Sequence, residues 1–164
     1  MTRILVPVED RRFGQAQVEF LRKHELAPDT HFTLLTVIVP IVTPDYGFAV
    51  PHHYLEAIAA EDEAGSVKLL NDLVKELQEQ FPEALIETQI ETGRPVYEIC
   101  RVAKEGNYDW IVLGSHGRSG LDKFFLGSVS LSVINHAHCS VSIVRLNSQY
   151  KLLDAKAIAE TAKA

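Results

Sequence analysis

The chain has 164 residues, of which 46% are hydrophobic and 23% charged, and its formal net charge at pH 7 is −6. This size and composition are typical of one soluble globular domain, and no run of 18 apolar residues predicts a transmembrane helix. The negative charge provides no basic field for a polyphosphate backbone, which argues against nucleic-acid binding.

The chain enters a strand-like apolar run at once, over residues 4–8. Because no signal-peptide h-region or cleavage site precedes this run, we expect a cytoplasmic protein without a membrane partner. The two cysteines, Cys100 and Cys139, fall in apolar periodic segments and form neither a disulfide framework nor a zinc-ligand spacing. We expect reduced, mostly buried thiols.

Five segments have the composition of β-strands. Three are near-continuous apolar runs, as expected where helices cover both faces of a parallel sheet, and they predict central strands over 4–8, 32–39 and 109–113. Two less apolar segments, 85–90 and 141–146, predict the outer strands.

Helical periodicity fills the intervals between these strands. It predicts helices over 15–24, 54–80 and 128–137, and one that begins at Pro95 and carries Val96, Ile99, Cys100 and Ala103. The regular alternation of strands and helices predicts right-handed crossovers in a doubly wound α/β sheet.

Two segments lie outside this alternation. Residues 40–53 form a long predicted loop with Tyr46, Phe48, His52 and His53, and it is a candidate cover for a ligand. Residues 147–164 carry Leu152, Leu153, Ala157 and Ile158 in a helix-forming context, which leaves open whether this tail docks or stays frayed.

A glycine pattern follows the fourth predicted strand and leads into the last predicted helix. Its spacing is Gly-x2-Gly-x9-Gly-Ser, from Gly114 through Gly117 to Gly127 and Ser128. Glycines let backbone N–H groups approach an anion, and a helix N-terminus favours negative charge. The P-loop and dinucleotide fingerprints are both absent from the sequence. One glycine alone would indicate a turn, but three with the serine favour a phosphate-binding loop.

This pattern resembles the nucleotide-binding signature of the universal stress protein family. The resemblance covers roughly residues 3–146, is strongest over 109–144, and includes the turn at Gly93-Arg94-Pro95. It implies a single domain over 1–146 with a five-stranded parallel sheet of order 3-2-1-4-5 and helices on both faces. Ligands would then bind at the carboxyl ends of the first and fourth strands, where the strand order reverses.

Family members with the full glycine motif bind ATP, usually with a divalent cation such as Mg²⁺ or Mn²⁺ on its phosphates. The resemblance implies that Glu9 lies near the base, at a position where aspartate is common in the family. It implies the remaining roles as follows: apolar walls around adenine from Val37 and Leu113, ribose contact at Gly114, phosphate contact at Gly117, Gly127 and Ser128, and continuation of the helix N-terminus at Val129. Further departures from the family pattern are Arg11, where a small hydroxyl residue is frequent, and Ser140, where proline is frequent.

Charged residues near the glycines have two open interpretations. Arg118 and Lys123 either neutralise phosphate charge or are solvated loop charges. The spacing of His136, His138 and Cys139 does not predict a metal site, and no protein metal ligand or catalytic residue is predicted.

The leading hypothesis is therefore an ATP-binding regulatory protein of the stress response, with slow or no hydrolysis. An ATP-using enzyme, either an ATPase or an adenylyl-transfer protein, and a nucleotide-free interaction module are the alternatives. An exposed apolar sheet edge is a liability that self-pairing removes, so residues 141–146 predict a homodimer, and the family resemblance points the same way.

Overall fold

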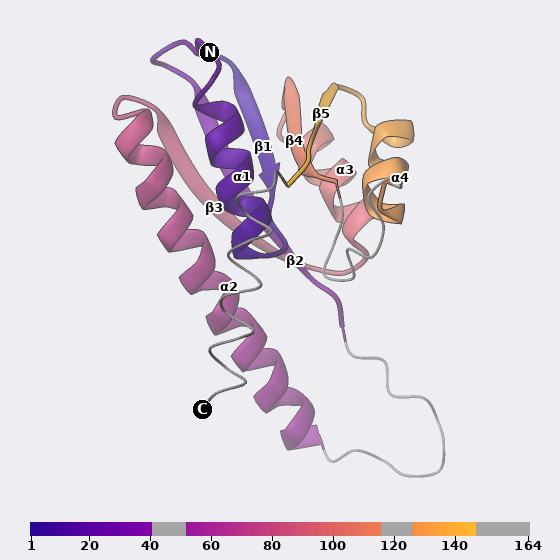
Figure 1. Ribbon diagram of the computed structural model, residues 1–164. Helices are drawn as coiled ribbons and strands as arrows, with labels where there is room; N and C mark the ends of the chain where they lie inside the picture. Colours follow the sequence, from indigo (N-terminus) through magenta and orange to yellow (C-terminus); the bar gives the residue numbers. More distant parts are fainter. Residues whose placement is uncertain (41–51, 116–125, 147–164) are drawn as a thin grey trace.

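The computed structural model describes residues 1–40, 52–115 and 126–146. The predicted fold is confirmed, because five parallel strands form one sheet in the order β3-β2-β1-β4-β5 (Figure 1). The elements described are β1 (Arg3–Pro7), α1 (Arg11–Leu21), β2 (His31–Ile38), α2 (His52–Gln80), β3 (Leu85–Thr92), α3 (Pro95–Glu105), β4 (Trp110–Gly114), α4 (Ser128–His136) and β5 (Ser140–Val144).

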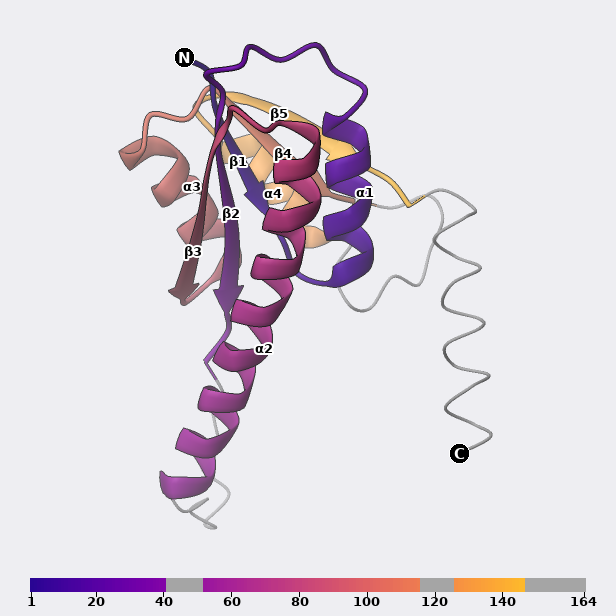
Figure 2. The ribbon, with the colours of Figure 1, turned by 90° about the vertical axis from the view of Figure 1, so that its left-hand side faces the viewer.

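Helices cover both faces of the sheet, α1 and α2 on one and α3 and α4 on the other (Figures 1 and 2). Side chains of β1 alternate between the two cores, as the pleat of a strand requires. Ile4, Val6 and Val8 belong to the core under α1 and α2, whereas Leu5 belongs to the core under α3 and α4. All four are buried, which explains why this central strand is apolar without interruption.

Several predicted boundaries are corrected by the structure. Helix α1 begins at Arg11 rather than near residue 15, because the Asp10 carboxylate caps it by accepting a hydrogen bond from the Phe13 N–H at 3.0 Å. Helix α2 begins at His52, inside the segment predicted as a loop. Strand β3 continues to Thr92, and β5 ends at Val144 rather than at residue 146.

Helix α2 has 29 residues and is longer than the sheet it covers, so its N-terminal half extends past the carboxyl ends of the strands (Figure 2). Its buried contacts come from Leu70, Leu73 and Leu77, in the C-terminal half. By contrast, Tyr54 and Ile58 near its start are exposed. The second half of α2 therefore anchors this helix to the domain.

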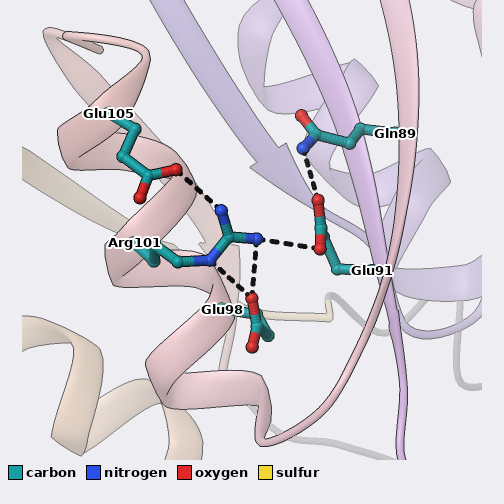
Figure 3. A network of polar contacts seen from close by, with 5 residues as sticks. All are labelled: Gln89, Glu91, Glu98, Arg101 and Glu105. Carbon is teal, nitrogen blue, oxygen red and sulfur yellow. Dashed lines mark hydrogen bonds and ion pairs between the residues drawn. The ribbon is translucent and has the colours of Figure 1, made fainter.

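Arg101 on α3 joins this helix to the end of β3 (Figure 3). Its guanidinium contacts Glu91 of β3 at 2.8 Å, and on α3 it contacts Glu98 at 2.8 Å and Glu105 at 2.7 Å. The hydrogen bond to Glu98 is the largest cause that raises the pKa of Arg101, and the other carboxylates add to it. Glu98 also lies against Gly93, whose φ of +156° favours glycine. The turn from β3 to α3 is thus fixed by the ion pair of Arg101 with Glu91 before the turn and by Glu98 after it.

No helix within the described ranges is long and apolar enough to cross a membrane.

Candidate functional site

The strand order reverses between β1 and β4, which lie side by side in the middle of the sheet. Their chains leave in opposite directions, because β1 leads to α1 on one face and β4 leads toward α4 on the other (Figure 1). The ladder between them pairs Ile4 with Trp110 and Leu5 with Ile111. The pairs between β1 and β4 end there, and in open α/β sheets ligands bind outside the carboxyl ends of the strands at such a reversal of strand order.

Two hydrogen bonds hold the start of α4 at the end of β4. The Gly127 N–H donates to the Ser115 carbonyl oxygen at 2.8 Å and thereby closes the connection between strand and helix at its base. The buried Ser130 hydroxyl donates to the Gly114 carbonyl oxygen, also at 2.8 Å. The N-terminus of α4 is consequently fixed beside the carboxyl end of β4.

The first turn of α4 begins with Gly127 as its N-cap, and no side chain caps it by a hydrogen bond. The first N–H groups of a helix have no partner within the helix, and its dipole adds partial positive charge there. Ser128 is exposed and Val129 is half-buried. The structure thus brings three of the predicted residues together at one helix terminus.

The N–H of Gly127 was expected to face a phosphate, but in this structure the Ser115 carbonyl oxygen occupies it. Gly127 also has φ −59° and ψ 153°, a conformation open to any residue. Glycine at this position is therefore not required by the backbone conformation.

Glu9 and Asp10 follow β1 but differ in environment. Glu9 is exposed, whereas Asp10 caps α1 and accepts a hydrogen bond from Arg12 at 2.9 Å. Sequence reasoning missed this structural role of Asp10, although an aspartate directly before a helix is a common N-cap signal.

Val37 and Leu113, the predicted apolar walls, lie at the carboxyl ends of β2 and β4. Both pack against the core under α3 and α4, where Leu113 is buried and Val37 is half-buried. They share one side of the sheet, and most of the Leu113 side chain already contacts protein. Gly114 ends β4 against the Phe13 ring, which a Cβ at that position would approach to 2.8 Å.

Gly117 and Arg118 lie outside the described residues, as do His116 and Lys123. The same holds for residues 41–51 of the predicted covering loop and for the tail over 147–164.

Two surface cavities lie away from the carboxyl ends of β1 and β4. One, of about 310 Å³, lies between α1 and α2 and is lined in part by Glu19, Glu76 and Glu79. The other, of about 650 Å³, lies at the amino ends of β4 and β5, near Tyr108 and Cys139. Neither presents a helix N-terminus, and in the lining of the first the three glutamates outnumber its one cation, Arg22, which is unfavourable for an anion.

The two cysteines are half-buried rather than mostly buried, and both thiols are free. Burial raises the pKa of Cys100 and is the largest cause that raises the pKa of Cys139, to which the charges of Asp109 and Cys100 add. Raised values keep the thiols protonated, which is unfavourable for a nucleophile. In the described part of the chain, no three His, Cys, Asp or Glu residues are grouped closely enough to hold a metal ion.

Known proteins are similar to this chain in sequence. YxiE of Bacillus subtilis is 38% identical over 96 residues, 58% of this chain, and MJ0531 of Methanocaldococcus jannaschii is 34% identical over 91 residues, 49% of this chain. Both relatives are universal stress proteins, and the matched stretches span 64% and 54% of their lengths.

Solved structures agree with the fold. The protein MJ0577 has a TM-score of 0.74 at 21% identity, over 90% of this chain and 97% of its own. An Arabidopsis thaliana universal stress protein family protein with AMP bound has a TM-score of 0.63 at 24% identity, over 91% and 94%. A universal stress protein in complex with cAMP has a TM-score of 0.62 at 18% identity, over 89% and 98%.

The sequence model of the universal stress protein family matches residues 1–145, a range that contains all of the described strands and helices. Together with the strand order and the relatives, this match confirms the predicted family. The chain belongs to the universal stress protein family.

Proposed function

We propose that this chain is a regulatory stress-response protein that binds ATP with a divalent cation in the crevice between β1 and β4. The observation that carries the proposal is the α4 N-terminus, which Ser130 and Gly127 tie to the end of β4 at the reversal of strand order. Proteins of the same fold hold AMP and cAMP, which supports an adenine nucleotide as the ligand class.

The phosphates would bind the N–H groups of Ser128 and Val129 and the Ser128 hydroxyl, with further contacts from Gly117 and Arg118. Gly127 would allow close approach rather than donate, because its own N–H bonds to Ser115. Glu9 would accept from the base, Gly114 would lie near the ribose, and Val37 and Leu113 would supply apolar contacts. Mg²⁺ or Mn²⁺ would bind through phosphate oxygens and neutralise part of their charge.

The output in this proposal is regulation, with slow or no hydrolysis. Rapid phosphoryl transfer requires an oriented water and strong charge neutralisation. Release of inorganic phosphate at about 1–100 per second, the ordinary range for kinases, would instead support the ATP-using enzyme.

A homodimer through the edge of β5 belongs to the same proposal, as does a cytoplasmic location. The described sheet has two outer strands, and β3 carries Glu87 and Glu91, whereas β5 has no charged residue between Ser140 and Val144. Charges on an edge strand discourage pairing between copies, so the uncharged β5 edge is the one suited to pair. Leu131 and Ile134 of the preceding helix α4 expose apolar surface as well.

Native mass spectrometry of the purified chain, with and without ATP and magnesium, tests this function. The proposal predicts a dimer that gains the mass of one ATP and its cation per chain. Replacement of the ATP adduct by an ADP adduct within seconds would favour an enzyme. No adduct at millimolar ATP would leave the nucleotide-free interaction module.

A further inference from the structure

Gln17 of α1 lies beneath the point where β1 and β4 separate. Its side chain is fully buried, and its Nε2 donates to the Pro7 carbonyl oxygen at 2.8 Å and to the Val112 carbonyl oxygen at 2.9 Å. One amide group thus joins the ends of β1 and β4, although Gln17 and Val112 are 95 residues apart in the sequence. Its Oε1 is buried and has no hydrogen-bond partner within the described ranges.

The position of Pro7 explains why a side chain is needed there. Leu5 is the last residue of β1 that pairs with β4, opposite Ile111. In a parallel ladder the next rung would join the N–H of residue 7 to the carbonyl of Val112. Proline has no N–H, so this rung cannot form, and the Gln17 amide supplies the missing donor.

We infer that Gln17 is a positioning residue that sets the separation of β1 and β4 at the floor of the crevice, and thereby the affinity for nucleotide. This inference rests on the proposed function. The amide bridges both carbonyls and holds the strands apart by the width of one NH₂ group, and Val112 lies two residues before Gly114. Beyond the bridge, the chain stays paired with β2, because the Val8 N–H donates to the Leu35 carbonyl oxygen at 2.7 Å.

Packing alone does not account for glutamine at this position. A buried amide oxygen without a partner destabilises the folded state, and methionine would occupy a similar volume without that cost. The hydrogen bonds to two strand ends are what methionine could not supply.

Two variants separate positioning from stability. Gln17→Met removes the bridge, and we expect the affinity for ATP with magnesium to fall about tenfold, as for the loss of well-formed buried hydrogen bonds. The double variant Pro7→Ala with Gln17→Met restores an N–H that can complete the ladder to Val112. It should recover the urea midpoint of the wild type while its ATP affinity stays reduced, because the strands then close.

The matched control is Tyr108→Phe, which removes a buried hydrogen bond of 2.6 Å from Tyr108, just before β4, to the Thr33 hydroxyl of β2. This variant should lower the urea midpoint. Its ATP affinity should stay within about twofold of the wild type, a change much smaller than the tenfold loss expected for Gln17→Met. Wild-type affinity in Gln17→Met, or affinity that returns together with stability in the double variant, would overturn the inference.

A second readout requires no nucleotide. Amide hydrogen exchange at Val8 and Ser115, which bond to Leu35 and Val144, should accelerate in Gln17→Met and not in Tyr108→Phe. If the wild type binds no ATP, the proposed function fails, and this measurement still decides whether Gln17 holds the two strand ends. Unchanged exchange at both amides would reject that role.

Discussion

The Gly127 N–H donates a hydrogen bond of 2.8 Å to the carbonyl oxygen of Ser115, across a connection of eleven residues. This bond brings the end of β4 and the start of α4 together. A helix N-terminus that is fixed in place can present its backbone donors to an anion at a lower entropic cost than a free one.

Ser130→Ala tests the second tether between α4 and β4. The variant removes a buried hydroxyl that donates to the Gly114 carbonyl, and we expect a loss of about 1 kcal/mol in the free energy of unfolding. Ser66→Ala is the control, because its hydroxyl makes a bond of the same length, 2.8 Å, to Asp62 on the exposed part of α2. Urea denaturation should show the loss in the first variant and nearly none in the second; equal effects would contradict the assigned tether.

Two glycines in helices should respond to alanine in opposite directions. A Cβ on Gly14 would overlap the Leu73 side chain between α1 and α2, so Gly14→Ala should destabilise the fold by about 1–3 kcal/mol. A Cβ on Gly65 meets nothing within 4 Å, so Gly65→Ala should stabilise it by about 0.5–1 kcal/mol through helix propensity. Thermal and urea unfolding of both variants measure these changes, and a tolerated Gly14→Ala would show that the α1–α2 contact is looser than described.

The thiols predict a dependence of stability on pH. Burial raises the pKa of Cys100 and of Cys139 above the value in the unfolded chain, so the folded state holds these protons more tightly. The contribution of these thiols to stability is complete below their pKa in the unfolded chain, about 8.5, and is lost as the pH rises through their higher pKa in the folded chain. Urea midpoints should therefore fall between pH 7 and pH 10, and less steeply in Cys100→Ala with Cys139→Ala. An identical slope in this variant would remove the thiols from the effect.

The β5 edge can be tested with one proline on each outer strand. Ile143→Pro removes an N–H that the alternation of β5 directs away from β4, and we expect the dimer to dissociate because that edge can no longer pair. Thr88→Pro makes the same change on the outer side of β3 and should leave the dimer intact. Sedimentation at tens of micromolar distinguishes these results. A monomeric wild type, or a dimer that survives Ile143→Pro, would exclude this interface.

The sequence predicted the sheet well because its signals are local and repeated. Apolar strands such as 109–113 alternate with periodic helices, and this alternation permits few topologies. It predicted helix starts less well, since the first turn of α1 contains Arg11 and Arg12, which carry no apolar periodicity. The signal in the sequence that indicated the true start of α1 was Asp10, a residue type that commonly caps a helix N-terminus.

The candidate site was predicted through the glycine pattern, but Gln17 was not. A glutamine among apolar helix positions is ordinarily assigned to the solvent-facing side, and its burial depends on Pro7 and Val112, which are brought to it only by the fold. The occupied N–H of Gly127 is likewise a tertiary contact with no sequence signal of its own.

The central claim is that phosphate binds at the α4 N-terminus, and calorimetric titration with ATP and magnesium tests it most directly. Ser128→Ala removes one hydroxyl donor to a charged group, worth about 1.5–3 kcal/mol, and should weaken binding by roughly 10- to 150-fold. Gly127→Val places a branched side chain where the phosphate would approach, and binding should be lost. Because φ at Gly127 is −59°, backbone strain does not account for that loss. Wild-type affinity in both variants, folded as judged by circular dichroism, would place the nucleotide elsewhere and contradict the claim.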